Sequence, residues 1–316
     1  MADIQTTIKA VIKVARPIHW VKNFSVFAAL IFSGLLYDKI AFTNTFLAFW
    51  VFCFAASSTY IFNDIFDAKR DRLHPIKKNR PIASGSLPVL LAIFECGFLV
   101  LLALSIASEI SGALFALTLT YLILQILYSS FLKNIPIIDI IIIATGFVIR
   151  VYAGAFAINA HLSVWFLLCV ISVALFLAAG KRRSELGTLG SDGKTRQSLA
   201  KYSIELLNSY VTMFGSAAWM SWALFTFFET PAVPKNLWLF LAEFSKTTTI
   251  SKLLMVTIPI VIFAVMRYQS LIFEGRSESP EKVLLKDVSL MVSIAIWTFL
   301  VIWILYGGIM LHFNTV

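Results

Sequence analysis

Charged residues are scarce in this chain. Of its 316 residues only 14% are charged, 59% are hydrophobic, and the mean hydropathy is +0.86. So few polar side chains cannot cover the surface of a soluble domain of this length. The scarcity of charge therefore excludes a soluble globular protein and predicts an all-α, polytopic membrane protein.

Cysteine is also rare. Cys53, Cys96 and Cys169 each fall within an apolar run, without paired spacing. This pattern excludes a disulfide framework or a cysteine metal site and favours small core residues. Residues 1–20 lack the apolar core of a cleavable signal peptide and carry basic residues throughout, so none is expected.

Long apolar runs are abundant. A membrane crossing needs about 20 apolar residues, and this criterion predicts about nine transmembrane helices. The predicted spans are 24–40, 44–65, 87–106, 111–132, 135–158, 163–180, 207–228, 249–270 and 288–312. They form one integral-membrane domain over residues 1–316, with polar loops at about 66–86 and 180–205.

The Lys and Arg residues are distributed unevenly between the loops. With the N-terminus inside, the inner segments carry 21 of the 26 basic residues, the outer segments carry 4, and Arg150 lies within a span. Basic residues concentrate on the cytoplasmic side, so we predict an inner (plasma) membrane protein with a cytoplasmic N-terminus and an external C-terminus. The net charge of +9 is then a feature of the cytoplasmic face and does not indicate nucleic-acid binding. This one-sidedness also disfavours a transporter or channel, which needs polar features toward both faces.

Three carboxylates follow the apolar run of residues 46–62. Asp64, Asp67 and Asp71 stand at i, i+3 and i+7, so on a continuing helix they project within roughly 60° of one another. Their mutual repulsion is relieved by a divalent cation, and Mg²⁺ suits one or two carboxylates together with substrate phosphates. We predict that these aspartates, with Asn63, hold Mg²⁺.

Basic residues crowd the next dozen positions, among them Lys77 and Arg80. Cations beside a metal site are natural partners for phosphate, so the stretch predicts a Mg²⁺–diphosphate site at the cytoplasmic face. The alternative is a solvated loop whose Lys and Arg residues only fix the topology.

Other polar positions lie at the predicted inner ends of helices. Lys22 precedes the first span beside Trp20, and Tyr128 and Lys133 close the fourth. We take Lys22, Tyr128 and Lys133 as candidate phosphate or substrate ligands. Trp20 is equally explained as an interfacial anchor, and Asp139 as a carboxylate at a helix start.

Arg150 stands alone within a span. It follows Asp139 by eleven residues, on nearly the same helix face. A buried arginine in a membrane costs a few kcal/mol at least and marks a functional position by default, so Arg150 is a candidate phosphate ligand. Close helix packing around Gly154 is the structural alternative.

A second basic stretch closes the sixth predicted span. Lys181, Arg182 and Arg183 precede Glu185. One acid among three cations favours a phosphate cradle over a second metal site. Lys181 and Arg182 are the candidate phosphate ligands, and Glu185 is a partner of an arginine, the metal or a hydroxyl group.

Together these motifs resemble the UbiA superfamily of intramembrane prenyltransferases, over essentially the whole chain. The first motif is carried by Asn63, Asp64, Asp67, Asp71, His74, Lys77, Arg80 and Gly85. Tyr128, Ser129, Lys133 and Asp139 match a further family motif, and the family's nine-helix architecture with a cytoplasmic N-terminus agrees with the spans counted above.

The chain departs from the family where aromatic prenyltransferases have a second aspartate-rich motif, because residues 180–185 read Gly-Lys-Arg-Arg-Ser-Glu. This is similar to the branch typified by decaprenyl-phosphate phosphoribosyltransferase. The resemblance implies Mg²⁺-dependent transfer of a phosphoribosyl group from phosphoribosyl pyrophosphate (PRPP) to a polyprenyl monophosphate, with Asp64, Asp67 and Asp71 as the catalytic residues. Enzymes that modify polyprenyl-phosphoryl sugars are candidate downstream partners. The alternative is prenyl transfer from a prenyl diphosphate to an aromatic acceptor.

Overall fold

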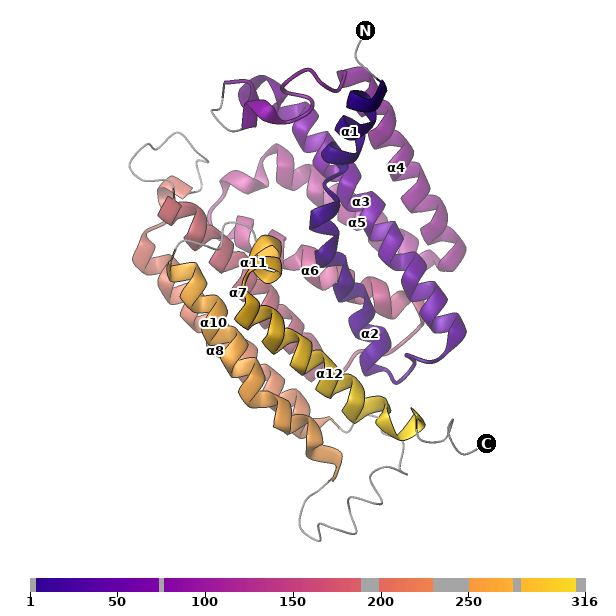
Figure 1. Ribbon diagram of the computed structural model, residues 1–316, viewed down its shortest axis with the longest axis vertical. Coiled ribbons are helices and arrows are strands. Elements are labelled where there is room, and N and C mark those ends of the chain that lie inside the picture. Colours follow the sequence, from indigo (N-terminus) through magenta and orange to yellow (C-terminus); the bar gives the residue numbers. More distant parts are fainter. Residues whose placement is uncertain (1–3, 74–76, 189–198, 230–249, 275–279, 311–316) are drawn as a thin grey trace. The chain divides into compact units, whose positions relative to one another are not determined.

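The computed structural model describes residues 4–73, 77–188, 199–229, 250–274 and 280–310, and the described residues form helices and turns without a strand (Figure 1). Eight helical segments among them are long and apolar enough to cross a membrane. The long helices are α3 (Lys39–Asp71), α4 (Val89–Ile110), α5 (Gly112–Ser130), α6 (Ile138–Ala157), α7 (Val164–Thr188), α8 (Ile204–Phe228), α10 (Ile258–Phe273, directly after the 3-10 helix η5, Ile250–Thr257) and α12 (Val288–Met310). The predicted all-α, multi-pass membrane fold is confirmed.

The first predicted span, 24–40, differs from the other eight. It contains the end of the 3-10 helix η1 (Pro17–Val26) and the short helix α2 (Phe27–Phe32). Six helical residues rise only about 9 Å, against about 30 Å of hydrocarbon. Soon after α2, Gly34 has a φ of 78°, a backbone conformation that ends helices. The apolar run is therefore divided by this turn and does not form one long helix.

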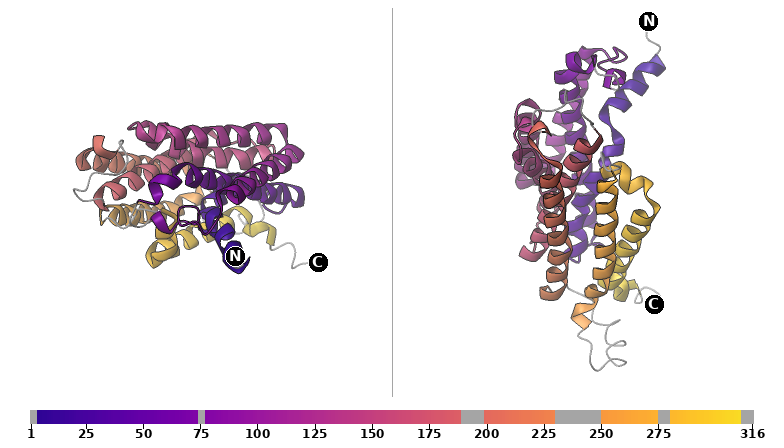
Figure 2. Two further views of the ribbon diagram at one scale, coloured as in Figure 1. Left: turned by 90° about the horizontal axis from the view of Figure 1, so that it is seen from above. Right: turned by 90° about the vertical axis from the view of Figure 1, so that its left-hand side faces the viewer.

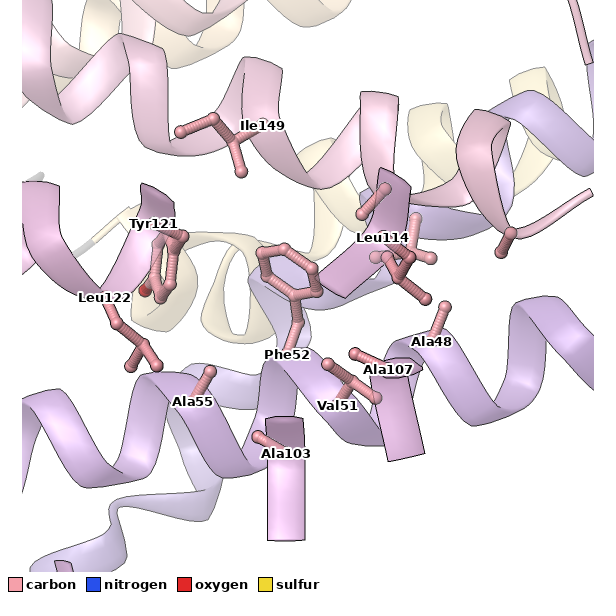
Figure 3. Packing of buried hydrophobic residues seen from close by; sticks show 13 residues of the cluster. Ala48, Val51, Phe52, Ala55, Ala103, Ala107, Leu114, Tyr121, Leu122 and Ile149 are labelled. Carbon is pink, nitrogen blue, oxygen red and sulfur yellow. The ribbon is translucent and has the colours of Figure 1, made fainter. Parts of the chain in front are cut away.

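The chain forms two compact units. The first comprises residues 1–27, 39–133 and 149–159, and the second comprises residues 28–38, 134–148 and 160–316. In the first unit α3 packs against α4, α5, η1 and the N-terminal helix α1 (Ile4–Ala15). Phe52 of α3 points toward α5, and Ala103 and Ala107 of α4 belong to the same apolar cluster (Figure 3). Small residues at these contacts allow close helix packing, as in other membrane proteins.

A second apolar cluster of this unit supports the loop after α3. Val14 of α1 packs with Ile61 and Ala68 of α3, and with Ile82 and Leu87 of the loop. The loop contains the short 3-10 helix η2 (Lys77–Asn79). Because Ile82, two residues after Arg80, is packed against α3 in this cluster, Arg80 is held near the end of α3.

The second unit is built on the long helices α7 and α8, with α10 packed against both and against α12 (Figure 2). A Cβ at Gly180 would lie 2.5 Å from Ile272 Cδ1, so the glycine lets α7 approach α10 closely. The short helix α11 (Pro280–Lys286) contacts α12. Near the start of α6, Ile140 packs with Ala178 of α7 and with Tyr202, which follows the 3-10 helix η4 (Leu199–Lys201).

Candidate functional site

The aspartate motif lies on the last two turns of α3, which continues past the apolar run to Asp71. Asp64 and Asp71 are each only 2% exposed, whereas Asp67 is half-buried. Buried carboxylates need partners, and each of the three has a basic one.

Arg80 joins two of the aspartates. Its Nη1 donates to Asp64 Oδ1 at 3.0 Å and to Asp71 Oδ2 at 2.7 Å. Two carboxylates about two helical turns apart therefore converge on a single cationic nitrogen. This convergence is what the i, i+7 spacing provides once a cation lies between the two groups.

Arg16 supplies a second cation to Asp64. Its Nη2 donates to Asp64 Oδ1 at 2.7 Å, and its guanidinium carbon lies 5.3 Å from the centre of the Tyr60 ring. Arg16 is the residue before η1 and has a φ of 53°, a left-handed conformation that non-glycine residues seldom adopt. A strained backbone thus directs Arg16 toward the buried carboxylate.

Asp67 has a different partner. Lys133 Nζ lies 3.4 Å from Asp67 Oδ2, and the lysine itself is only 7% exposed. Lys133 belongs to the 3-10 helix η3 (Leu132–Asn134) directly after α5, which also carries Tyr128 at its end. The end of α5 is thereby tied to the end of α3 by one ion pair.

Four other predicted residues of the first unit are half-buried: Asn63 on α3, Lys22 on η1, Lys77 on η2 and Tyr128 on α5. His74, which belongs to the aspartate motif, lies outside the described residues. The structure thus brings Asp64, Asp71 and Arg80 together, and pairs Asp67 with Lys133.

The donor set of this cluster suits a hard divalent cation. Among the described residues no three His, Cys, Asp or Glu side chains gather in a group that could hold a metal. Magnesium, however, typically takes one or two protein carboxylates and completes its shell with water and substrate phosphate. Asp64 and Asp71 already converge on one positive nitrogen, so two carboxylate oxygens are in place for such an ion.

Arg150 lies in a separate polar network of the first unit. It is 5% exposed, its Nε donates to Asn23 Oδ1 at 2.7 Å, and its Nη2 donates to the hydroxyl of Tyr121 at 2.9 Å. Asn23 is fully buried and also donates to Cys53 Sγ at 3.3 Å. The guanidinium therefore links α6 to η1 and α5, and through Asn23 to α3.

The second unit holds a buried ion pair at the start of α6. Arg182 Nε lies 2.6 Å from Asp139 Oδ2, and neither side chain is exposed. Arg182 also pairs with Glu185 one turn along α7. A carboxylate that only began its helix would remain accessible to water, so the structure favours an ion-pair role for Asp139 over a simple helix-start charge.

Tyr202 completes this second cluster. Its hydroxyl donates to Asp139 Oδ1 at 2.8 Å and accepts from the backbone N–H of Ile137 at 2.5 Å. Burial of the phenol raises the pKa of Tyr202, and Asp139 beside it acts in the same direction. Ile137 has a φ of 69°, unusual for a β-branched residue, and the Tyr202 hydroxyl holds its amide.

The other basic residues at the end of α7 are less enclosed. Lys181 is half-buried, and Arg183 Nε donates to Asn208 Oδ1 of α8 at 2.6 Å. The following loop, with Asp192, Lys194 and Arg196, lies outside the described residues. Elsewhere in the unit, Arg267 of α10 pairs at 2.6 Å with Asp287, which lies between α11 and α12.

Reasoning from sequence did not include Arg16, Asn23, Gly154 or Tyr202 among the site residues. Arg16 and Asn23 stand in the same short basic and aromatic segment as Lys22, and this segment is the signal in the sequence that points to them. Nothing in the sequence marks Tyr202 apart from its place after a charged loop.

Comparison with known proteins places these features in a family. The sequence pattern of the UbiA prenyltransferase family matches residues 23–184. The decaprenyl-phosphate phosphoribosyltransferase of Mycolicibacterium smegmatis is 35% identical over 296 residues, which is 92% of this chain and 90% of that protein. The enzyme of the same name from Corynebacterium glutamicum is 35% identical over 304 residues, covering 93% of this chain and 86% of that protein.

A solved structure shares the fold at low sequence identity. It is that of a UbiA homolog from Archaeoglobus fulgidus bound to DMAPP and Mg²⁺, with a TM-score of 0.65 and 19% identity. The match covers 93% of this chain and 98% of that one. At this identity the likeness concerns the fold alone, and it agrees with the arrangement of helices described above.

Proposed function

Because this chain belongs to the UbiA prenyltransferase family, we propose that it transfers the 5-phosphoribosyl group of PRPP to a polyprenyl monophosphate of the decaprenyl type and releases pyrophosphate. The protein is a transferase of the membrane. The observation that carries the proposal is its 35% identity to decaprenyl-phosphate phosphoribosyltransferases over about nine-tenths of both chains.

The charges of the described side chains support this choice of donor. A prenyl diphosphate has one charged end, whereas PRPP has a pyrophosphate and a 5-phosphate, and the acceptor adds another phosphate. The end of α7 carries Lys181, Arg182 and Arg183 and a single acid, Glu185. A cationic stretch of this kind suits substrates that bring more phosphate.

We assign the pyrophosphate of the donor to the aspartate cluster of the first unit. Asp64 and Asp71, with Asp67 and Asn63, would hold Mg²⁺, which when bound neutralises charge on the leaving pyrophosphate. Arg80 and Lys77 add positive charge toward the same group. Arg16 and Arg80 neutralise Asp64 in this structure. A divalent cation would replace them at the carboxylate, and the two guanidinium groups would then be available to bind phosphate.

The transfer step needs little help from a base. An oxygen of the acceptor phosphate, already an anion, attacks C1 of the ribose as the C1–O bond to pyrophosphate breaks. The sugar becomes oxocarbenium-like, as in glycosyl transfer generally. Pyrophosphate leaves with the electron pair of that bond, and no proton has to be removed from the nucleophile.

The other predicted residues are proposed to bind the remaining phosphates and the ribose. We assign Lys22, Lys181 and Arg182 to the 5-phosphate of the donor or the phosphate of the acceptor, and Glu185 to a ribose hydroxyl. Tyr128 and Lys133 border the aspartate cluster through the pair of Lys133 with Asp67.

We further propose that the protein is one domain of the inner membrane, with its N-terminus and charged loops in the cytoplasm and its C-terminus outside. The bias of 21 basic residues against 4 supports this orientation. Alkaline phosphatase fused after residue 86 should be inactive, and fused after residue 160 active; the reverse pattern would contradict the orientation. Its proposed downstream partners are enzymes that modify the lipid-linked sugar.

The test uses purified full-length protein in detergent with Mg²⁺, labelled PRPP and a short polyprenyl phosphate. Label that moves into the organic phase, and stops doing so with EDTA, supports the proposal. An enzyme that ignores PRPP but moves a prenyl group from a prenyl diphosphate to an aromatic acceptor would overturn it in favour of the alternative.

A further inference from the structure

Arg150 is a buried charge in the first unit. Two of its hydrogen bonds go to polar side chains of other elements, Asn23 of η1 and Tyr121 of α5. Its guanidinium also lies over the Tyr121 ring, at 5.0 Å from the centroid. Burying an arginine in a membrane protein costs free energy, so its presence indicates a function. Its bond to Asn23 suits a role in holding η1.

A second, independent contact holds the same segment. A Cβ built at Gly154 of α6 would lie 1.9 Å from the carbonyl oxygen of Val26, the last residue of η1. Such a distance is impossible for real atoms, and the opposing atom belongs to the backbone. Glycine at position 154 is therefore what allows η1 to lie directly on α6.

The other end of η1 leads into the aspartate cluster. Arg16, the residue before η1, pairs with Asp64, and Lys22 lies next to Asn23. Within η1, Trp20 Nε1 donates to Ser57 Oγ of α3 at 3.0 Å, and Ser57 Oγ donates to the carbonyl of Ala15 at 2.8 Å. One short rigid segment thus connects the Arg150–Asn23 bond to Arg16.

We infer that Arg150 and Gly154 are positioning residues for the donor site, which act by seating η1 so that Arg16, the residue before it, lies beside Asp64. The inference rests on the proposed function, since it treats η1 as part of the PRPP site. It replaces direct phosphate binding by Arg150, because the guanidinium is engaged by Asn23 and Tyr121 within the protein.

The variants follow from the geometry. Gly154→Ala forces the Val26 carbonyl away, and Gly97→Ala is its matched control, because Gly97 is also within a long helix but a Cβ there meets nothing within 4 Å. Arg150→Lys keeps the charge and loses the paired hydrogen bonds. Asn23→Asp keeps the oxygen that accepts from Arg150, and Asn23→Leu removes it.

Hydrogen–deuterium exchange by mass spectrometry tests the seating of η1 without any assay of activity. We expect faster exchange over residues 16–26 in Gly154→Ala, Arg150→Lys and Asn23→Leu. Exchange should stay near wild type in Gly97→Ala, and Asn23→Asp should be closer to wild type than Asn23→Leu. Unchanged exchange over residues 16–26 in Gly154→Ala and Arg150→Lys would overturn the inference, whatever reaction the enzyme catalyses.

Kinetics then tests the link to the donor. Misplacing binding groups by about 1 Å can cost about 100-fold in rate, so kcat/KM for PRPP should fall by about 10- to 100-fold in Gly154→Ala. We expect the KM for PRPP to rise while the KM for polyprenyl phosphate changes less than twofold, with partial recovery in Asn23→Asp relative to Asn23→Leu. Equal changes for both substrates would overturn the link between η1 and the donor. A wild type inactive toward PRPP would instead overturn the proposed function, and the same comparison would then be made with the prenyl diphosphate it accepts.

Discussion

Arg182 and Asp139 form an ion pair in which neither side chain is accessible to water, with Nε 2.6 Å from Oδ2. The pair joins the end of α7 to the start of α6 within the second unit. A fully buried pair contributes through its geometry, because the cost of desolvating both charges offsets most of their attraction. Removing one charged partner should therefore destabilise the protein more than replacing both partners with apolar residues.

The first prediction concerns this pair. Asp139→Asn leaves the Arg182 charge buried without its counter-ion and should destabilise the protein by about 3–5 kcal/mol, seen as a lower Tm in detergent. Asp139→Leu combined with Arg182→Met should recover part of the Tm, since an apolar pair of similar volume carries no buried charge, although Tyr202 and Glu185 each lose a partner.

Activity of the double variant separates two roles of Arg182. If Arg182 also binds a substrate phosphate, the double variant regains part of its Tm but not its transfer of phosphoribosyl label. Recovery of both would show that the arginine serves only the fold. Arg183→Met, in which an arginine of the same turn is changed, is the matched control for loss of positive charge.

Tyr202→Phe is the second prediction. The change removes the hydrogen bond to Asp139 and leaves the Ile137 amide without its acceptor. Unsatisfied buried groups cost about 1–3 kcal/mol each, so the Tm should fall. Tyr210→Phe, on α8 of the same unit and half-buried, is the control and should change the Tm little. An unchanged Tm in Tyr202→Phe would contradict the role given to the hydroxyl.

The raised pKa of Tyr202 fixes the sign of its pH effect. A group with a higher pKa in the folded state contributes its full stability below the unfolded value, about 10 for tyrosine, and loses it as the pH rises through the folded value. The contribution should therefore be constant across neutral pH and decline only in strong alkali. Above about pH 10, wild-type Tm should fall more steeply than that of Tyr202→Phe.

The sequence allowed the fold and the acidic face to be predicted because both depend on local pattern. Apolar runs of membrane length identify the long helices, and the i, i+3, i+7 spacing places the aspartates on one face once α3 continues to Asp71. The first span was predicted less well, because hydropathy does not register the 3-10 conformation of η1 or the turn at Gly34.

The partners of the charged residues could not be predicted. Many basic residues surround the aspartates, and only tertiary packing decides that Arg80 bridges Asp64 and Asp71 while Lys133 takes Asp67. The same holds for Gly154, whose helix-packing role was an open alternative. Its contact with the backbone of Val26 depends on where η1 lies, 128 residues earlier in the chain.

The third prediction tests the aspartates as ligands of the catalytic metal. Asp64→Asn should lower kcat by about 10²–10³-fold, since metal stabilisation of transition-state charge amounts to several kcal/mol and each factor of ten corresponds to about 1.4 kcal/mol. The measurement is transfer of label from PRPP to lipid across a Mg²⁺ titration, in which the variant should also need more Mg²⁺. Glu109→Gln, an exposed acid on α4, is the control. Activity of Asp64→Asn equal to that of Glu109→Gln at all Mg²⁺ concentrations would contradict the assignment.

The fourth prediction tests the metal site by measuring the thermal stability of Arg80→Gln with and without Mg²⁺. The guanidinium lies between Asp64 and Asp71, so Arg80→Gln leaves two buried carboxylates close together with less positive charge. Like charges in one place repel, and the Tm of Arg80→Gln in EDTA should be lower than that of wild type.

Mg²⁺ should then stabilise the variant more than the wild type. A ligand that binds only the folded state raises stability by RT ln(1 + [L]/Kd), and the absence of the competing guanidinium lowers Kd for a divalent cation at the two carboxylates. The rise in Tm between EDTA and millimolar Mg²⁺ should therefore be larger in Arg80→Gln than in wild type, while transfer activity falls because a phosphate partner is missing. Adding Asp64→Asn and Asp71→Asn to Arg80→Gln should abolish the Mg²⁺-dependent rise. A rise that persists without these carboxylates would place the cation elsewhere and refute their role as its ligands.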